Sequence, residues 1–284
     1  MQIGIVGAGN ISETHARAAR SIPGVGVAAV HGENRERTER LAAEHSATPY
    51  HDFARFLDHP LDLVVIGSPS GRHAEQGIAA ARRGLHVLVE KPLDISTERA
   101  DALIAAADAA GVRLGVIFQD RLHPAVGELK SMVDAGALGK PVMISGRVKW
   151  HRPREYYASS RWRGTWALDG GGALINQGIH TVDLVQWMFG SVTRVYGRTA
   201  TRVHEIEVED TAAAVLDFAN GAIGTLEAGT SIYPGYARRL EITGSEGTVV
   251  LEHDRLERVD LRSGSSGPTV EAGDQNASAS SPVV

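Results

Sequence analysis

Short apolar runs alternate with alanine-rich, helix-like runs throughout the first 120 residues, and this alternation constrains the fold more than any other feature. The apolar runs expected to form strands cover residues 3–7, 25–30, 63–67, 86–90 and 113–118. The expected helices lie near residues 11–21, 34–45, 71–83 and 97–110. Apolar strands separated by amphipathic helices indicate a parallel sheet covered on both faces. Right-handed crossovers make such a sheet doubly wound, so residues 1–120 are expected to form an α/β domain.

The pattern changes after residue 120. A helix is expected at about 123–135, a strand at 141–150, a polar and aromatic loop at 151–169, and a second helix at 173–189. Strand-like segments then follow one another at 192–201, 211–218, 222–230, 238–243 and 248–252. Strands without intervening helices indicate a mostly antiparallel, open sheet. Residues 121–284 are therefore expected to form an α+β domain, with a weakly ordered end rich in Ser, Gly and Ala.

Bulk properties exclude several classes of protein. The net charge of −5 and a pI near 6.2 leave no basic surface of the kind that binds nucleic acid. No apolar run approaches the ~20 residues of a membrane-spanning helix. The chain contains no cysteine and begins directly with a strand-like run rather than a signal peptide. We therefore expect a cytoplasmic protein that binds neither nucleic acid nor membrane.

A glycine pair directly follows the first expected strand. Gly7 allows a tight turn, and Gly9 lets the backbone approach a pyrophosphate at the start of the next helix. The third position of this pattern must be small so that helix and strand can pack, and Ser12 occupies it. A plain tight turn is the alternative, but the position between the first strand and first helix favours a dinucleotide site.

The end of the second strand should distinguish NAD from NADP. A carboxylate there accepts a hydrogen bond from the ribose 2′-hydroxyl and repels a 2′-phosphate. The chain reads His31-Gly32-Glu33, with the acid one step late and Arg35 and Arg37 close by. Either cofactor fits this pattern, with a slight preference for NAD through Glu33.

Residues 87–92 read Val-Leu-Val-Glu-Lys-Pro, a short apolar strand that ends in a charged pair and a proline. Only four lysines occur in the chain, so Lys91 does not reflect a general use of lysine. Proline ends the strand and fixes the backbone just after this lysine. Open α/β sheets bind ligands at the carboxyl ends of their strands. By itself, such a lysine is more often a surface residue at a strand end, but other motifs accompany it.

A second chemical motif begins at the triple glycine 170–172. Asn176, His180 and Asp183 follow at spacings i, i+4 and i+7, which places them on one face of the expected helix. An imidazole between an amide and a carboxylate can be held in one tautomer. A zinc site formed by His180, Asp183 and either His123 or His204 is an alternative. It lacks a local cluster of ligands, so no metal is expected.

Together these motifs resemble those of the glucose–fructose oxidoreductase / inositol dehydrogenase / rhizopine-catabolism (Gfo/Idh/MocA) family. Gly7-x-Gly9, Glu90-Lys91-Pro92 and the triple glycine followed by His180-x-x-Asp183 carry the resemblance, and Ser68-Pro69-Ser70 with His73 and Gln119-x-Arg121 add to it. The resemblance implies a Rossmann domain, an open antiparallel sheet and NAD(P)-dependent redox chemistry on sugars or polyols. It also implies a cis peptide bond before Pro92. The cofactor-binding residues that it implies are Gly7, Gly9, Asn10, Ile11, Ser12, Glu33, Ser68, Pro69, His73, Glu90, Lys91 and Gln119.

Two departures from the family pattern matter. The family often has Asp where this chain has Asn176, and its members usually continue for about 50 further residues, so the chain is expected to be truncated. In the expected mechanism, His180 is the general base and Lys91 bonds the substrate oxygen. Asn176 orients the hydroxyl group, and Asp183 holds His180 or a sugar hydroxyl. Burial and the missing carboxylate at position 176 should both favour neutral Lys91.

The loop at 151–169 supplies aromatic rings and guanidinium groups that suit sugars and anionic groups. Tyr156, Trp162 and Arg163 are expected to contact substrate together with Asn176 and His180. A nucleotide-sugar is one candidate substrate. A non-catalytic dinucleotide-binding regulator and an NAD-dependent glycosidase are alternative functions. The open sheet face is expected to support a homodimer or homotetramer.

Overall fold

A computed structural model describes residues 1–262 and 264–266 of the 284-residue chain, in two compact units. The first unit comprises residues 1–119, 152–179 and 199–211, and the second the remainder. Segments 152–179 and 199–211 thus belong to the first unit, although the sequence analysis placed them after its domain boundary at residue 120. The weakly ordered end expected from the sequence lies outside the described residues, apart from its first positions.

A six-stranded parallel sheet forms the centre of the first unit, in the order β3-β2-β1-β4-β5-β6. The strand order reverses between β1 and β4, which creates the crevice where doubly wound sheets bind dinucleotides. The predicted Rossmann fold is therefore confirmed. Its strands are β1 (Gln2–Val6), β2 (Gly26–His31), β3 (Thr48–Tyr50), β4 (Leu63–Ile66), β5 (His86–Val89) and β6 (Leu114–Val116).

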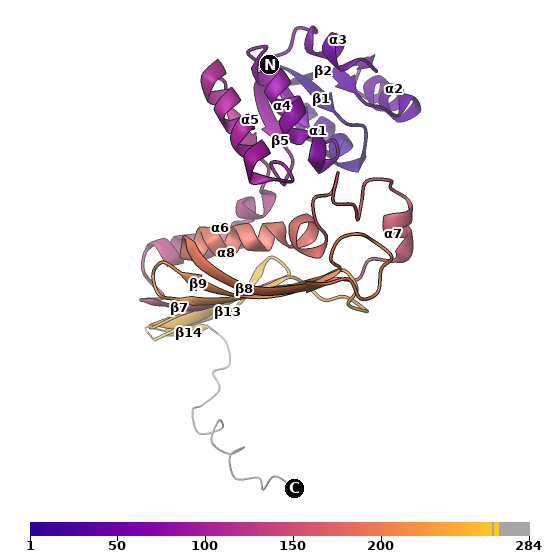
Figure 1. Cartoon of the computed structure of the whole chain (residues 1–284). Coiled ribbons are helices and arrows are strands. Elements are labelled where there is room, and N and C mark those ends of the chain that lie inside the picture. The colour runs from indigo at the N-terminus through magenta and orange to yellow at the C-terminus, as the bar shows by residue number, and fades with distance from the viewer. Residues whose placement is uncertain (263, 267–284) are drawn as a thin grey trace, which may run out of the picture. The chain divides into compact units, whose positions relative to one another are not determined.

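Helices connect these strands (Figure 1). Their ranges are α1 (Asn10–Arg20), α2 (Arg35–Glu44), α3 (Phe53–Leu57), α4 (His73–Ala81) and α5 (Thr97–Ala110). A further short helix of this unit, α7 (Arg154–Ala158), follows β7 in the chain. Local sequence explains several starts, because the Asn34, Asp52 and Ser96 side chains each accept a backbone N–H of the first turn. The sequence analysis missed β3 and α3, which are too short to show a hydrophobic period.

The second unit is built on an eight-stranded sheet, in the order β14-β13-β12-β11-β7-β10-β9-β8. Strands β7 and β11, β11 and β12, β12 and β13, and β13 and β14 pair antiparallel, whereas β7 and β10 run parallel. The sequence missed β13, but the mostly antiparallel sheet that it predicted is present. The strands are β7 (Pro141–Lys149), β8 (Val192–Ala200), β9 (Thr211–Phe218), β10 (Ile223–Gly229), β11 (Arg239–Gly244), β12 (Gly247–Glu252), β13 (Arg255–Leu261) and β14 (Gly264–Ser266).

Two helices, α6 (Pro124–Asp134) and α8 (Ile179–Phe189), lie along one face of this sheet (Figure 1). Leu129 and Leu184, both fully buried, pack there with Ile144, Leu240 and other strand residues. Residues 173–189 do not form the single α-helix expected from the sequence, because Ala173–Gly178 form a π-helical segment before α8. Within the described residues, no helix has both the length and the apolar character that a membrane crossing requires.

Candidate active site

The glycine loop lies between β1 and α1. Gly7 has φ +106°, and a Cβ added there would lie 2.6 Å from the Gly67 carbonyl oxygen. A Cβ added to Gly9 would meet nothing within 4 Å, so this backbone faces open space. Helix α1 begins after Gly9 without a side-chain cap, which leaves its first N–H groups available to a ligand. This cradle fits the pyrophosphate of a dinucleotide.

A cavity of about 1010 Å³ opens from this loop and is lined entirely by residues of the first unit. Of the predicted cofactor residues, those that line it are Gly7, Gly9, Asn10, Ile11, Glu33, Ser68, Pro69, His73, Glu90, Lys91 and Gln119. Ser12 is the exception, because its side chain is fully buried between the loop and the strand ends. Its position therefore serves helix–strand packing rather than ligand contact.

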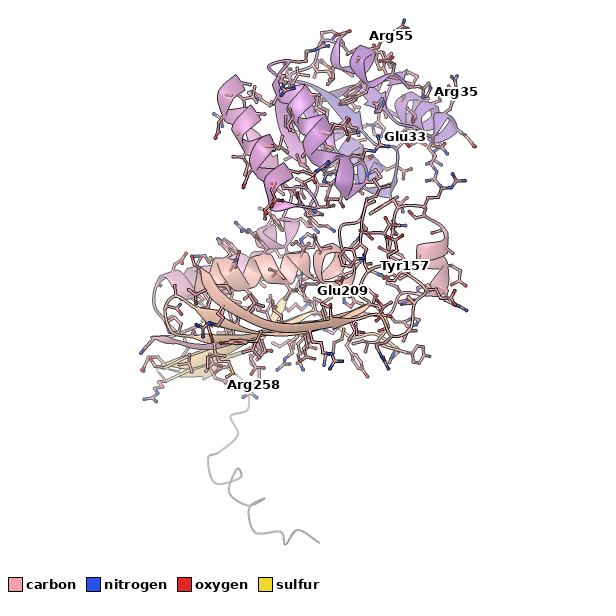
Figure 2. The ribbon with its side chains drawn as sticks, viewed as in Figure 1. Glu33, Arg35, Arg55, Tyr157, Glu209 and Arg258 are labelled. Carbon is pink, nitrogen blue, oxygen red and sulfur yellow. The ribbon has the colours of Figure 1, made fainter. Side chains whose placement is uncertain are left out.

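The far end of the cavity follows β2, where His31 is buried and Glu33 is exposed (Figure 2). The Glu33 carboxylate lies 3.5 Å from Arg72, which also lines the cavity. Burial lowers the pKa of His31. An acid and several basic groups thus meet where the adenine ribose of a dinucleotide would bind.

Glu90 directly follows strand β5 and connects its end with helix α1. Its buried carboxylate bonds the His15 ring at 2.8 Å and accepts the Lys91 backbone N–H at 3.2 Å. The Lys91–Pro92 peptide bond is cis, as predicted. The buried His73 ring lies 2.8 Å from the Pro92 carbonyl oxygen and 2.9 Å from that of Ser68. His73 therefore ties two cavity-lining loops together rather than projecting freely into the cavity.

Lys91 extends toward the π-helical segment, where its Nζ donates to the Asn176 carbonyl oxygen at 2.9 Å. Burial lowers the pKa of Lys91, and the carboxylates of Glu90 and Asp169 oppose that shift. The predicted direction was right, but the expected lack of a counter-carboxylate was wrong. Asp169 supplies one and accepts the Asn176 Nδ2 at 2.5 Å.

The three predicted substrate-binding residues of the loop all line the cavity. The Tyr156 ring packs under the guanidinium of Arg163, 4.6 Å from its centroid, and its hydroxyl accepts from Gln177. Arg163 also lies over the Trp162 ring at 5.2 Å. Its Nε is buried and has no hydrogen-bond partner among the described residues. This arrangement can bind a polar or anionic group.

The segment that carries Asn176 is anchored by a residue that the sequence analysis did not identify. Glu209 accepts the backbone N–H groups of Gly172 and Leu174 at 2.9 and 2.8 Å (its position is labelled in Figure 2). A Cβ at Gly172 would lie 1.7 Å from the Glu209 carbonyl oxygen, so only glycine allows this approach. Nothing local in the sequence indicates a pairing over 37 residues.

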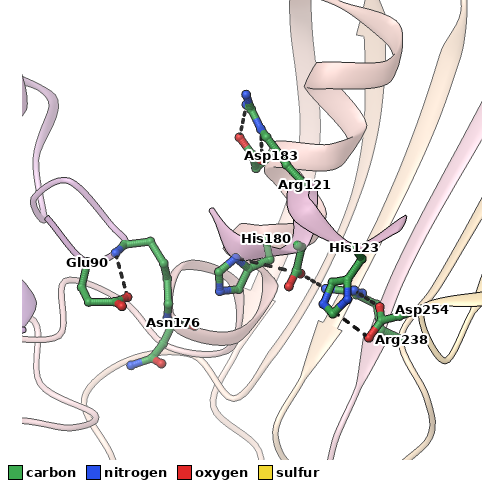
Figure 3. Close-up of polar contacts among 10 residues, drawn as sticks. Glu90, Arg121, His123, Asn176, His180, Asp183, Arg238 and Asp254 are labelled. Atoms are coloured by element: carbon green, nitrogen blue, oxygen red, sulfur yellow. Dashed lines mark hydrogen bonds and ion pairs between the residues drawn. The ribbon is translucent and has the colours of Figure 1, made fainter. Parts of the chain in front are cut away.

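A separate group of residues, in the second unit, includes His180. This histidine is buried, and its Nδ1 lies 3.9 Å from Asp120. Asp120 pairs with Arg238, and Arg238 pairs with Asp254 (Figure 3). The imidazole therefore faces a carboxylate that is paired with a half-buried arginine.

Asp183, which the sequence analysis expected to hold His180 or a sugar hydroxyl, has Arg121 as its partner in the structure. Its carboxylate binds Arg121 through two hydrogen bonds of 2.7 and 2.5 Å (Figure 3). The expected i, i+4, i+7 face assumed one α-helix, whereas the π-helical segment at Asn176 changes the rotation per residue. His204, considered as a metal ligand, instead packs against the Tyr157 ring at 4.8 Å.

Comparisons with known proteins agree with this fold. Residues 1–118 match the model of the oxidoreductase family with an NAD-binding Rossmann fold, and residues 126–250 match the GFO/IDH/MocA C-terminal domain. Scyllo-inositol 2-dehydrogenase (NAD(+)) of Bacillus subtilis is 30% identical over 273 residues, which cover 91% of this chain and 76% of that protein. Levoglucosan dehydrogenase of Pseudarthrobacter phenanthrenivorans is 26% identical, over 92% of this chain and 76% of that protein.

Among solved structures, the WlbA dehydrogenase of Bordetella pertussis, in complex with NADH and UDP-GlcNAcA, is similar with a TM-score of 0.89 and 34% identity. The match covers 97% of this chain and 80% of that one. The two family models together span most of the chain and meet near residue 120. This chain therefore belongs to the Gfo/Idh/MocA family of oxidoreductases and carries its NAD-binding Rossmann domain.

Proposed function

We propose that this protein is an NAD(H)-dependent dehydrogenase that oxidises a secondary hydroxyl of a sugar, polyol or nucleotide-sugar, or reduces the corresponding ketone. The observation that carries the proposal is the placement of Lys91. Its half-buried amine lines the same cavity as the glycine loop and donates to the Asn176 carbonyl oxygen at 2.9 Å. A dinucleotide sensor would not require an amine at this point.

Oxidation of an alcohol removes a hydride from carbon and a proton from oxygen. Bound NAD+ supplies the hydride acceptor, and the reacting atoms must approach within ~3–3.5 Å. In the proposed reaction, Lys91 hydrogen-bonds the substrate oxygen and His180 accepts the hydroxyl proton. His180 follows Asn176 by four positions in the chain, so a short segment of backbone joins the two residues. Asp120, rather than Asp183, orients the imidazole.

We propose NAD rather than NADP as the preferred cofactor. Glu33 lines the cavity after β2, where a carboxylate favours a free 2′-hydroxyl over a 2′-phosphate. The neighbouring Arg72 could bind a phosphate, but it is 3.5 Å from the Glu33 carboxylate. Titration with both nucleotides tests this choice, and tighter binding of NADP would reject it.

The substrate proposal rests on Arg163 and the relatives. A guanidinium with a buried, unbonded Nε beside Tyr156 favours a substrate that carries an anionic or strongly polar group. UDP-GlcNAcA, scyllo-inositol and levoglucosan, named with the relatives, form the first test panel. Turnover of UDP-GlcNAcA with a lower KM than the neutral compounds would support the role of Arg163.

We further propose a homodimer or homotetramer that uses the sheet of the second unit. Val195 and Tyr196 on β8 and Val215 on β9 are 60%, 54% and 42% exposed, which is unusual for large apolar side chains. Sedimentation of the purified protein tests this assembly, and a monomer at micromolar concentration would reject it. A cytoplasmic location forms part of the proposal, since the reaction draws on the cell's nicotinamide nucleotides.

The decisive experiment follows the absorbance of reduced nicotinamide while the panel is supplied with NAD+. Substrate-dependent reduction supports the dehydrogenase. Tight cofactor binding without turnover on any compound would favour a regulator instead. Release of a sugar from a glycoside without net change of cofactor would favour a glycosidase.

A further inference from the structure

Asp169 is a buried carboxylate that the proposed reaction does not yet use. It is 2% exposed and directly precedes the triple glycine. Its Oδ2 accepts the Gly164 backbone N–H at 2.8 Å, and its Oδ1 accepts the Asn176 side-chain amide at 2.5 Å. Both oxygens are therefore engaged inside the unit, on the loop and on the π-helical segment.

Asn176 connects this carboxylate with Lys91. The side-chain Nδ2 of Asn176 donates to Asp169, while its main-chain carbonyl accepts from the Lys91 Nζ at 2.9 Å. The Asn176 Oδ1 accepts from Gln177 at 3.2 Å, which fixes the amide orientation. A change at Asp169 should therefore alter the hydrogen-bond acceptor that positions the amine.

The charges around Lys91 are few. Glu90 precedes it and is itself bonded to His15, Asp169 faces it through Asn176, and Arg163 lies near Asp169. Burial raises the pKa of Asp169, while its hydrogen bonds and the two nearby cations oppose this. If Asp169 were neutral, Glu90 would be the carboxylate that still favours the charged form of Lys91. The positive charge of Arg163 would then no longer be offset by Asp169.

We propose that Asp169 is a positioning residue for Lys91: it holds Asn176 against the amine and provides a counter-charge to it. The role of Lys91 in turnover rests on the proposed function, but the coupling of Asp169 to Lys91 does not require turnover. With Asp169 ionised, the lysine keeps its proton to higher pH. Without that charge, Lys91 becomes a free amine at lower pH.

The test measures the rate at which Lys91 is acylated by acetic anhydride as a function of pH, by mass spectrometry, because only the neutral amine reacts. The chain has four lysines, and exposed Lys140 serves as an internal reference. In Asp169→Asn, the Lys91 profile should move to lower pH. Below the midpoint its reaction should be faster by roughly three- to tenfold relative to Lys140.

Two further variants separate charge from structure. Asp169→Asn/Asn176→Asp exchanges the paired side chains and should return the Lys91 profile toward that of the wild type. Asp134→Asn removes an exposed carboxylate paired with Lys130, so it should leave the Lys91 profile unchanged. Thermal unfolding and NAD binding of each variant establish that it is folded.

A wild-type Lys91 profile in folded Asp169→Asn would overturn the inference, as would a shifted profile that the exchange variant fails to restore. If the profile responds as expected but no compound of the panel is turned over, the proposed function fails and this inference stands. If turnover is found, the limb of the kcat profile that reports Lys91 should move to lower pH in Asp169→Asn. If Asp169 had only a structural role, Asp169→Asn would lower the stability without shifting this limb of the kcat profile.

Discussion

The Lys91 group and the His180 group differ in how their functional side chains are held. Lys91 and Glu90 close strand β5, and the glycine loop closes β1, so short sequence motifs place these groups at the end of a parallel sheet. His180 instead depends on Asp120 and on Arg238, residues that no local motif links to it. The first group should therefore tolerate few changes within its motif. The second should be sensitive to substitutions far away in the sequence.

Replacing Lys91 should have the largest effect on activity. Lys91→Met keeps the length and apolar stem but removes the amine, and kcat should fall by roughly 10²–10⁴-fold. Binding of NAD should change little, because the cradle is formed by the glycine loop. Steady-state kinetics and cofactor titration measure the two effects. Lys140→Met, at an exposed lysine, is the matched control, and equal losses in both variants would reject the role of Lys91.

The glycine loop allows two matched substitutions with opposite expectations. Gly9→Ala adds a methyl into open space, so stability should be unchanged while the Kd for NAD rises by about tenfold, or ~1.4 kcal/mol. Gly7→Ala forces alanine into φ +106° and against the Gly67 carbonyl, which should destabilise the fold by about 1–3 kcal/mol. Calorimetric titration and chemical denaturation distinguish them. Unchanged NAD affinity in Gly9→Ala would show that the pyrophosphate does not bind at this loop.

The same contrast explains what the sequence could predict. The Rossmann topology and the cavity-lining residues of the glycine loop follow from hydrophobic period and short motifs. The cis Lys91–Pro92 bond was implied by the resemblance to the family. Asp169 and Asp120 were missed because a carboxylate's partner is set by tertiary packing, which sequence spacing does not encode. The alignment of Asn176 with His180 and Asp183 did not follow from their spacing, because the π-helical segment that carries Asn176 breaks the α-helical period.

Asp120 and Asp183 provide a direct comparison within the second group. Asp120→Asn should lower kcat by about tenfold, because the amide holds the imidazole and Arg238 less well than a carboxylate does. Asp183→Asn weakens only the pair with Arg121 and should change kcat by less than about twofold. Kinetics of both variants at a fixed pH decide between the two carboxylates. A larger loss in Asp183→Asn would restore the sequence-based assignment and reject the role of Asp120.

Replacing Glu209 should have the smallest effect on catalysis, although Glu209 also contacts residues that are far from it in the sequence. Glu209→Gln keeps one acceptor oxygen but replaces the other, so one of the N–H bonds at the start of the π-helical segment is lost. The cost should be about 1 kcal/mol of unfolding free energy, with kcat within about twofold of the wild type. Denaturation and kinetics on the same preparation measure both. A large loss of kcat with little loss of stability would mean that this remote carboxylate acts on the chemistry as Asp120 does. In that case, the Lys91 and His180 groups would differ in how far apart their contacting residues lie in the sequence. They would not differ in whether those contacts serve catalysis or stability.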